Sequence, residues 1–539
     1  MTTHPLFVVS VTCFAIACTP AASEECFVDA QCPAGMACLA GQCGEPEGST
    51  GEAVETTGPI DKLDLGGGVG DGQTCASAEF VATNAGCEFW ATDLPNVWAP
   101  SSAYSLDIAA EQTFAVVVAN VSAEDNAEVS VFAGAQSDPL QTATVGPLGT
   151  YAFLLPNDLQ IDPTRTGRGR AFRVESDRPI TAYQFQPLDN LAPVYSNDAS
   201  ALLPVHVLGT DYVAITSNGY SVNLYPDGFE PVVLPTGAYV TVVATEDTTQ
   251  VAFFPTDALL EGDWQGVVLD RGETFTLVSN PQDPRAGNGS LSGTRVISDR
   301  PLAAFSGNIA ASVPETATEC CLDHVEHQLL PTVAWGARYV TAPPPDALDP
   351  AHDDPVEIRL VGAYDDTPLV YPLGMPAGAP TTIDAHRTVA FSTTEPVIVE
   401  SADPDKPFAL AQYLYNAEET NPTGVTGDPS MIVVPSVEQL MDRYVFLAPY
   451  GYATSTVTVV APHGAEVRLD DKPLGDSRLI GDADGVTWGY RRAKIDPGAH
   501  VVSSDEPIGI TVVGYDRFVS YAYAGGSAVA VIHDAPPAP

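Results

Sequence analysis

The sequence predicts an all-β protein made of tandem, antiparallel, sandwich-like modules. A proline-containing strand phrase recurs four times in 539 residues, with its prolines at Pro179, Pro301, Pro396 and Pro507. Between the phrases lie short runs of β-branched residues separated by turn-forming Pro, Asp and Gly, and few windows have helical periodicity. A spacing of about one hundred residues matches one β-sandwich domain and is too long for a solenoid repeat. Sandwich packing is the expected architecture, with propeller-like or barrel closure as the open alternative.

The recurring phrase predicts a structural turn that leads into a strand. It reads FRVESDRPI at 172–180, VISDRPL at 296–302, FSTTEPV at 391–397 and VVSSDEPI at 501–508. Proline has no N–H for a β-ladder, so it is expected at a strand start or a sheet edge. The Asp of the phrase is expected to hydrogen-bond the turn backbone.

A second phrase fixes the phase of the repeat. Leu-Leu-Pro at 202–204 and 329–331, and Val-Val-Pro at 433–435, are each followed eight or nine residues later by Tyr-Val. The first unit lacks this opening and starts near Cys87. The predicted modules are 73–200, 201–328, 329–430 and 431–530, followed by a tail at 531–539.

The N-terminus predicts export. Residues 1–17 contain an apolar run of signal-peptide length that is too short to span a bilayer, and the segment leads into Cys18, which resembles a lipobox cysteine. Cleavage at 21–23 is the alternative. Lipidation of Cys18 would anchor the protein at the outer membrane or cell surface of a bacterium. Residues 44–72 are rich in Gly, Glu, Thr and Asp and predict a flexible linker.

Cys13 would leave with the signal peptide and Cys18 would carry lipid, so eight of the ten cysteines remain, an even number that suits disulfides in an oxidising compartment. Four of them predict a small disulfide knot within 18–43, with zinc as the alternative, because so short a segment cannot bury a core. Cys75 and Cys87 are expected to pair across a short loop, and the connectivity of the adjacent Cys320 and Cys321 stays open. The four knot cysteines are Cys26, Cys32, Cys38 and Cys43.

Charge excludes one class of partner. The chain has 22 basic and 69 acidic residues, a formal net charge of −47. Such a surface repels phosphate backbones, so we expect no nucleic-acid binding, and membrane contact only through the N-terminal lipid. The charge serves solubility, or else calcium binding outside the cell.

Candidate sites are few. His324, Glu326 and His327 are metal-ligand residue types, but their spacing is not that of a zinc protease, and an ordinary structural loop is the better interpretation. The acidic turns at 352–354 and 482–485 are possible calcium ligands, although neither completes a known loop. No catalytic residues and no cofactor are predicted.

Two segments resemble a known family. Residues 291–308, LSGTRVISDRPLAAFSGN, and 321–331, CLDHVEHQLLP, are similar to signatures of the IgGFc-binding protein N-terminal domain family. The second departs from the family pattern by inserting Leu322 and His327 and by having Leu330 in place of a proline. The resemblance extends over 80–525 and implies an extracellular β-rich module. Fc binding is described for animal members of the family, and we carry over only fold and location.

Together these observations predict a cell-surface or secreted binding and adhesion protein, not an enzyme. Its tandem modules would present loops to an extracellular protein or glycan. A structural envelope or matrix lipoprotein without a specific ligand is one alternative, and a secreted hydrolase is another that no motif supports.

Overall fold

The computed structural model describes residues 37–39, 42–44, 74–81, 83–97, 112–188, 196–224, 232–283, 288–315, 322–349, 351–420 and 426–536. These residues form antiparallel strands with a few short helical turns, which confirms the all-β class. The predicted signal peptide, Cys18, Cys26, Cys32, the linker after its first residue (45–72), Cys320 and Cys321 lie outside the described residues. In the predicted knot, Cys38 and Cys43 are register partners across β1 (Ala37–Leu39) and β2 (Gln42–Gly44).

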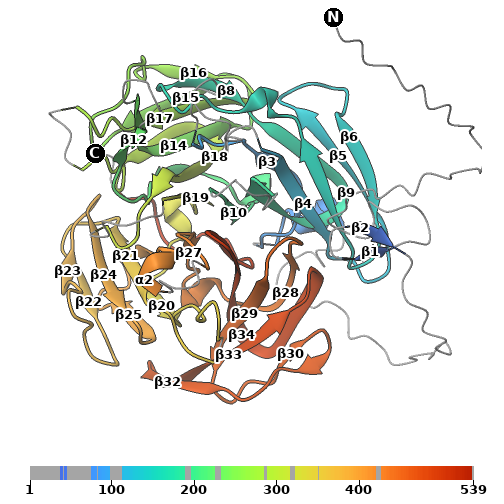
Figure 1. Ribbon diagram of the computed structural model, residues 1–539, viewed down its shortest axis with the longest axis vertical. Coiled ribbons are helices and arrows are strands. Elements are labelled where there is room, and N and C mark those ends of the chain that lie inside the picture. The colour runs from blue at the N-terminus through green and yellow to red at the C-terminus, as the bar shows by residue number, and fades with distance from the viewer. Residues whose placement is uncertain are drawn as a thin grey trace, which may run out of the picture.

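Four similar β units lie around a common centre (Figure 1). The first contains α1 (Cys75–Ala78), β3 (Gly86–Ala91), β4 (Phe114–Asn120), β5 (Ala127–Ala133), β6 (Gln141–Val145), β7 (Thr150–Leu155), η3 (Asn157–Leu159), β8 (Gly167–Arg170), β9 (Phe172–Gln186) and β10 (Asp198–Ala201). The second contains η4 (Val205–Val207), β11 (Gly209–Val213), β12 (Tyr220–Leu224), β13 (Val232–Thr236), β14 (Ala238–Ala244), β15 (Thr249–Phe254), β16 (Val267–Leu269), β17 (Glu273–Val278), β18 (Arg295–Ala311) and β19 (Asp323–Gln328).

The other two units repeat this order. The third contains η5 (Thr332–Ala334), β20 (Arg338–Thr341), β21 (Val356–Gly362), β22 (Thr367–Val370), β23 (Thr382–Ile383), β24 (Thr388–Thr393), β25 (Val397–Ser401), β26 (Phe408–Leu414), α2 (Ala417–Thr420) and β27 (Met431–Val433). The fourth contains η6 (Val437–Gln439), β28 (Met441–Ala448), β29 (Thr454–Pro462), β30 (Val467–Leu469), β31 (Lys472–Pro473), β32 (Arg478–Ala483), β33 (Val486–Ile495), β34 (Gly498–Asp516) and β35 (Val519–Ala524).

One long strand organises each unit. The first half of β18 pairs with β15 and β11, and its second half pairs with β14 and β19. The two halves thus belong to two sheet layers, and side chains of both layers share one apolar core. Strands β9 and β34 are divided in the same way. The Ser-Asp-Arg-Pro phrase of the first two units lies at the bend between the halves.

The third unit corrects the predicted phase of the repeat. The phrase at 391–397 falls between β24 and β25, whereas the bend lies between β25 and β26, at 401–407. There the chain reads SADPDKP, in which Asp405-Lys406-Pro407 is the counterpart of Asp-Arg-Pro. The additional residues in this segment break the long strand into β25 and β26. The prediction therefore places the bend proline at Pro396, whereas the structure places it at Pro407.

A tyrosine hydrogen bond recurs at the bends of the second, third and fourth units. The hydroxyl of Tyr212 donates to the carbonyl of Leu302 at 2.8 Å, and that of Tyr444 donates to Ile508 at 2.6 Å. Tyr339 donates to Phe408 at 2.5 Å, the residue after Pro407, which supports the corrected phase.

The Asp of the phrase has an equally constant role. In the second unit, Oδ1 of Asp299 accepts the backbone N–H of Gln250 at 2.8 Å. Asp177 accepts from Glu128 at 2.8 Å, and Asp505 accepts from Glu466 at 2.7 Å. The expected Asp bond to backbone is therefore present, directed at the neighbouring hairpin strand.

Each unit packs against the next, and the fourth packs against the first. Strands β4, β14 and β21 are buried along their whole length, whereas β15 alternates between buried and exposed residues. The extra burial arises because the core of each unit also contains side chains of its neighbour. These are Tyr239 and Phe305 in the first core, Ala411 and Tyr413 in the second, Val513 and Tyr515 in the third, and Tyr183 and Phe185 in the fourth.

Close backbone contacts recur at the seams between units. A Cβ placed on Gly86 would lie 2.4 Å from Pro204, and one on Gly209 would lie 2.5 Å from Pro331. Each contact joins the start of one unit to the Leu-Leu-Pro phrase of the next. In addition, β8, from the predicted first module, pairs with β17 of the second. The module boundaries themselves stay a prediction.

Candidate functional site

Asp198 lies where the inner strands of the four units meet. Its Oδ2 accepts the backbone N–H groups of Glu326 and Met431, both at 3.1 Å, and its Oδ1 accepts those of Ala522 at 3.3 Å and Ala199 at 2.9 Å. These residues belong to β19, β27, β35 and β10, which form no ladders with one another among the described residues. Their edge N–H groups therefore need other acceptors. A carboxylate offers about four lone-pair sites, so one side chain holds all four strands.

Polar side chains on β10 and just before it bond to the backbone of β19 in the same way. Ser196 Oγ accepts the N–H of His324 at 3.1 Å, and Ser200 Oγ accepts that of Gln328 at 2.8 Å. The amide of Gln184 on β9 donates to Oε2 of Glu326 at 3.0 Å. The centre of the ring is thus a buried polar network, and its polar atoms hold backbone edges together.

Burial raises the pKa of the carboxyl groups at this centre. Burial raises the pKa of Asp198 well above its usual range, and its four N–H partners oppose that rise. Burial also raises the pKa of Glu326, and the nearby Asp198 raises it further. The pKa of Asp323 is raised by burial and then by Asp428 and Asp198. These groups keep their protons to a higher pH than exposed carboxyls do.

The three predicted metal-ligand residues lie on β19 but on different faces. His324 and Glu326 share one face, with His324 Nε2 at 3.5 Å from Glu326 Oε2, while strand alternation turns His327 to the other face. Burial lowers the pKa of both His324 and His327 to about 3, so both rings are neutral. Within the part of the chain that the structure describes, no group of three His, Cys, Asp or Glu side chains is arranged to hold a metal ion. The sequence predicts a structural loop at these residues, and the structure places them in a buried strand instead.

In the two acidic turns with possible calcium ligands, at 352–354 and 482–485, a carboxylate forms an ion pair with an arginine. Asp353 contacts Arg492 and also accepts the hydroxyl of Tyr490 at 3.2 Å. Asp484 forms an ion pair with Arg338 across the seam between the third and fourth units. Burial raises the pKa of Asp354 to about 7, so this group is partly protonated at neutral pH. The sequence predicts no cofactor at these turns and offers calcium only as an alternative, and each arginine would compete with such an ion.

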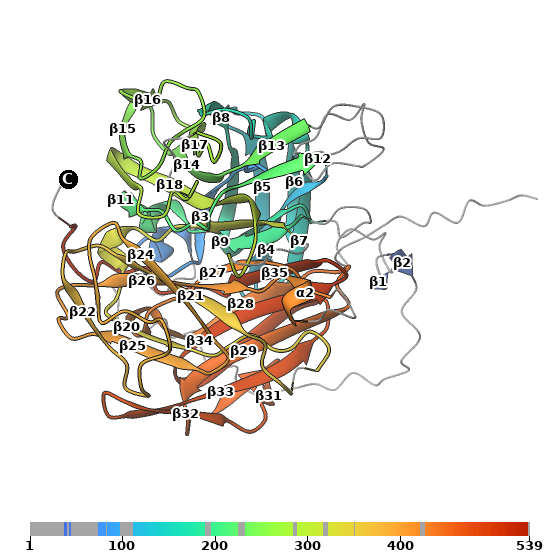
Figure 2. The same ribbon diagram turned by 60° about the vertical axis from the view of Figure 1, so that its left-hand side comes forward.

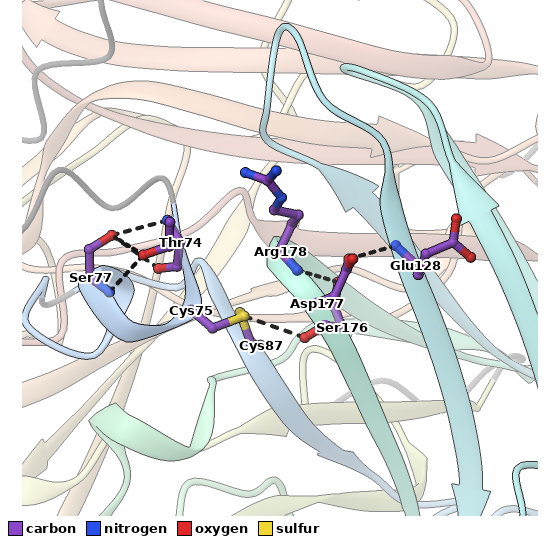
Figure 3. Close-up of a disulfide and its surroundings, with 8 residues drawn as sticks. All are labelled: Thr74, Cys75, Ser77, Cys87, Glu128, Ser176, Asp177 and Arg178. Atoms are coloured by element: carbon purple, nitrogen blue, oxygen red, sulfur yellow. Dashed lines mark hydrogen bonds between the residues drawn. A yellow bond between two sulfur atoms is a disulfide. The ribbon is translucent and has the colours of Figure 1, made fainter.

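The predicted Cys75–Cys87 disulfide is present, with an S–S distance of 2.07 Å (Figure 3). Thr74 caps α1, its Oγ1 accepting the N–H of Ser77 at 3.2 Å. The sulfur of Cys75 lies 3.4 Å from the carbonyl oxygen of Ser176, next to Asp177 in the bend of β9. The disulfide therefore ties the start of the first unit to its long strand.

Sequence reasoning missed a basic pocket on the fourth unit. A pocket of about 320 Å³ is lined by Arg478 on β32 and by Arg491, Arg492 and Lys494 on β33. The run RRAK at 491–494 was a visible signal, since basic residues are scarce in this chain. Arg478 and the third-unit residue Ala351, which also line the pocket, are distant in sequence, and only the fold joins them to the run.

Comparisons with known proteins identify relatives for most of the ring. A sequence model described as IgGFc binding protein matches residues 198–514, which is more than half of the chain. The human protein named IgGFc-binding protein is 25% identical over 336 residues, which cover 61% of this chain and 6% of the human protein. The match thus spans a small part of that relative. No described helix is long and apolar enough to cross a membrane.

Two solved structures align over 77% of the chain. They are an anti-sigma factor domain-containing protein from Clostridium clariflavum, 8% identical over 97% of that chain with a TM-score of 0.12, and E. coli alpha-2-macroglobulin, 12% identical over 28% of that chain with a TM-score of 0.10. At these TM-scores neither carries an argument about the fold.

Proposed function

Because the chain belongs to the IgGFc-binding protein family, we propose that it is an extracellular binding protein that presents a rigid β ring to a protein or glycan. In this proposal a signal peptide exports the chain, and the lipid on Cys18 anchors it at the surface of a bacterium. The human relative is named for binding IgG Fc. The ligand of this chain is a separate question, because the matched region is a small part of that protein.

One topological observation carries the proposal. The long strands β9, β18 and β34, and the shorter β26 of the third unit, each lead into an inner strand that pairs with them antiparallel. Since the four units are alike, these four connections gather at one end of the ring. Three of them are long, at 187–197, 312–322 and 415–430, whereas the fourth is only residues 517–518. Long connections on a rigid scaffold are where binding residues concentrate.

The polar interior supports binding rather than catalysis. His324 and Glu326 are completely buried within the ring. Their side chains contact the scaffold through Tyr239, which lies 3.5 Å from His324, and through Gln184. A buried group of this kind does not meet a substrate, so we assign it a structural role and leave ligand contact to the loops.

The test is binding by the full-length, oxidised protein to an array of immunoglobulin Fc, host-type glycans and bacterial envelope polymers, with and without calcium. We expect a saturable partner whose binding weakens at least tenfold when charge is reversed at the loop end of the ring by Glu419→Lys with Arg517→Glu. Arg468→Glu, on β30 away from these connections, is the control. A partner that tolerates the loop variant would show that binding lies elsewhere than the loop end. The absence of any partner from a well-folded protein would favour a structural envelope role instead.

A further inference from the structure

The basic pocket of the fourth unit is positively charged, whereas the molecule as a whole is negatively charged. The chain as a whole has three acidic residues for every basic one, with 69 against 22. The pocket is lined by four basic side chains, those of Arg478, Arg491, Arg492 and Lys494, and by one acidic side chain, that of Asp476. Elsewhere the surface field repels anions, so this pocket is a local exception that needs an explanation.

Two of the arginines are held rigidly around Tyr490. The guanidinium carbon of Arg492 lies 5.0 Å from the ring centre of Tyr490, and that of Arg478 lies 5.6 Å from it. Asp353 contacts Arg492 and lies 3.6 Å from Arg478. A further bond from Arg478 to the carbonyl of Ala351, at 2.8 Å, joins the pocket to the third unit. The arginine side chains are therefore positioned before any ligand arrives, which reduces the entropy lost on binding.

Arg491 is a buried cation that forms no ion pair with a described carboxylate, although Asp476 and Asp505 lie near enough to oppose the lowering of its pKa by burial. It is 8% exposed, and its Nε and Nη2 donate to the carbonyls of Gly475 and Ala465 at 3.2 and 2.9 Å. Nη1 is buried and has no hydrogen-bond partner among the described residues, and no described carboxylate lies within ion-pair distance. Burial lowers the pKa of Arg491 accordingly. An unsatisfied buried donor is costly, so an acceptor supplied from outside would stabilise this arrangement.

We propose that this pocket binds one anionic group of an acidic glycan, a sulfate ester or a uronate carboxylate. The two anions share the chemistry that arginine forks recognise, namely several oxygens that accept paired N–H donors. Lys494 is exposed on the same strand and adds a point charge at the pocket mouth. After Asp353 and Asp476 are set against the four basic groups, a net positive charge remains for the ligand.

A glycan fits the pocket better than an acidic protein segment does. A volume of about 320 Å³ is at the lower end of small-molecule sites, enough for one sugar residue and its anionic group. The lining is mostly polar and offers no exposed apolar side chain to anchor a peptide. The site lies on the β32–β33 hairpin and uses none of the residues of the four loop connections, so it does not depend on the function proposed above.

The test is calorimetric titration of the full-length protein with a sulfated heparin tetrasaccharide, a trigalacturonate, neutral maltotriose and a phosphoserine peptide. We expect saturable binding of the sulfated or the uronate oligosaccharide and none of maltotriose. The double variant Arg478→Ala with Lys494→Ala should weaken binding at least tenfold. Arg468→Ala with Lys472→Ala removes the same two charges from exposed positions on β30 and β31, and should leave binding unchanged.

Three results would overturn the proposal: no binding of either anionic oligosaccharide, an equal loss in the β30–β31 control, or binding of the phosphopeptide alone. If the double variant does not fold, because Arg478 also bonds to Ala351, Lys494→Glu takes its place, since Lys494 is exposed. The pocket and the loop end can fail separately, because Glu419→Lys with Arg517→Glu should leave oligosaccharide binding intact.

Discussion

The bends of the four long strands and the axis of the ring follow opposite rules. At the bends the same contacts recur, since Tyr212, Tyr339 and Tyr444 all donate to the residue after the bend proline. At the axis the units differ. Asp198 pairs in register with Gln186, and the equivalent positions in the second and fourth units are Val325 and Tyr521.

The difference has a geometric cause. Each bend is a separate place, so four copies of one contact fit without interference. The axis is a single place that four equivalent positions approach, and one carboxylate already accepts N–H groups from all four inner strands. Asp198 already raises the pKa of the buried Glu326 and Asp323, so a second carboxylate at an equivalent position would add more buried like charge. Repeated sequence can therefore build the periphery of a ring, whereas the centre requires the copies to diverge.

Excision of one unit tests this comparison most severely. If the bends were sufficient, residues 201–328 would fold alone as a module. We expect instead that the isolated segment does not unfold cooperatively, because β14 is buried on both faces and its outer face packs against the first unit. Circular dichroism during a urea titration measures this. A sharp transition in the isolated segment would show that the modules are independent.

Removal of the axial carboxylate is the next largest effect. Asp198→Ala leaves four backbone N–H groups without their acceptor, and each buried unsatisfied group costs about 1–3 kcal/mol. Since water can enter the space that the side chain leaves, we expect a total loss of about 3–5 kcal/mol. Urea unfolding of the full chain measures the loss. Asp177→Ala, an exposed bend position with one such bond, is the matched control and should cost much less.

The periphery is what sequence reasoning could predict. Strand runs, turn residues and the Tyr-Val phrase are local, and the Cys75–Cys87 disulfide spans a short loop, so pattern and spacing sufficed. The prediction was wrong for the bend of the third unit, because the residues inserted before Pro407 moved the phrase away from its expected spacing. Local patterns carry no information about how far an insertion displaces a bend.

The axis and the basic pocket lay beyond such reasoning. Asp198 accepts hydrogen bonds from Glu326, Met431 and Ala522, at sequence separations of 128, 233 and 324. The sequence near Asp198 contains no signal of these distant partners. The pocket likewise joins Ala351 of the third unit to Arg478 of the fourth. Packing between units creates both sites: the axis requires all four units, and the pocket requires the third and the fourth.

A change at Glu326 tests the charge at the axis. Its pKa is raised by burial, so the native state binds this proton more tightly than the unfolded state does. That stabilisation is complete below the unfolded pKa and is lost as pH rises through the folded pKa. Glu326→Gln keeps an acceptor for Gln184 and removes the titration. We expect the variant to gain at least about 1 kcal/mol relative to the wild type between pH 4 and pH 8, since one pKa unit corresponds to about 1.4 kcal/mol. Parallel stability curves in urea across this pH range would contradict the assignment.

A tyrosine at one bend has a smaller expected effect. Tyr212→Phe removes a hydroxyl that donates to Leu302 and accepts the N–H of Gly209, both at 2.8 Å. We expect a loss of about 1–2 kcal/mol, since both hydrogen bonds are removed and their backbone partners lose satisfaction. The change in the urea midpoint at constant slope measures it. Tyr151→Phe, at a partly exposed position on β7, is the control and should be nearly neutral.

The smallest effect gives the sharpest comparison among the units. Asp299→Ala removes acceptors for the backbone and side chain of Gln250, on an exposed surface, so we expect a loss of about 0.5–1.5 kcal/mol. Asp177→Ala and Asp505→Ala should cost about the same, because each removes the same bond to a neighbouring hairpin. Asp405→Ala should cost less, since the broken strand of the third unit provides Asp405 with no such backbone bond among the described residues. Unequal losses among the first three variants would mean that the bends share a geometry but differ in their contribution to stability. The bends would then vary among units, as the axis positions do, only to a smaller extent.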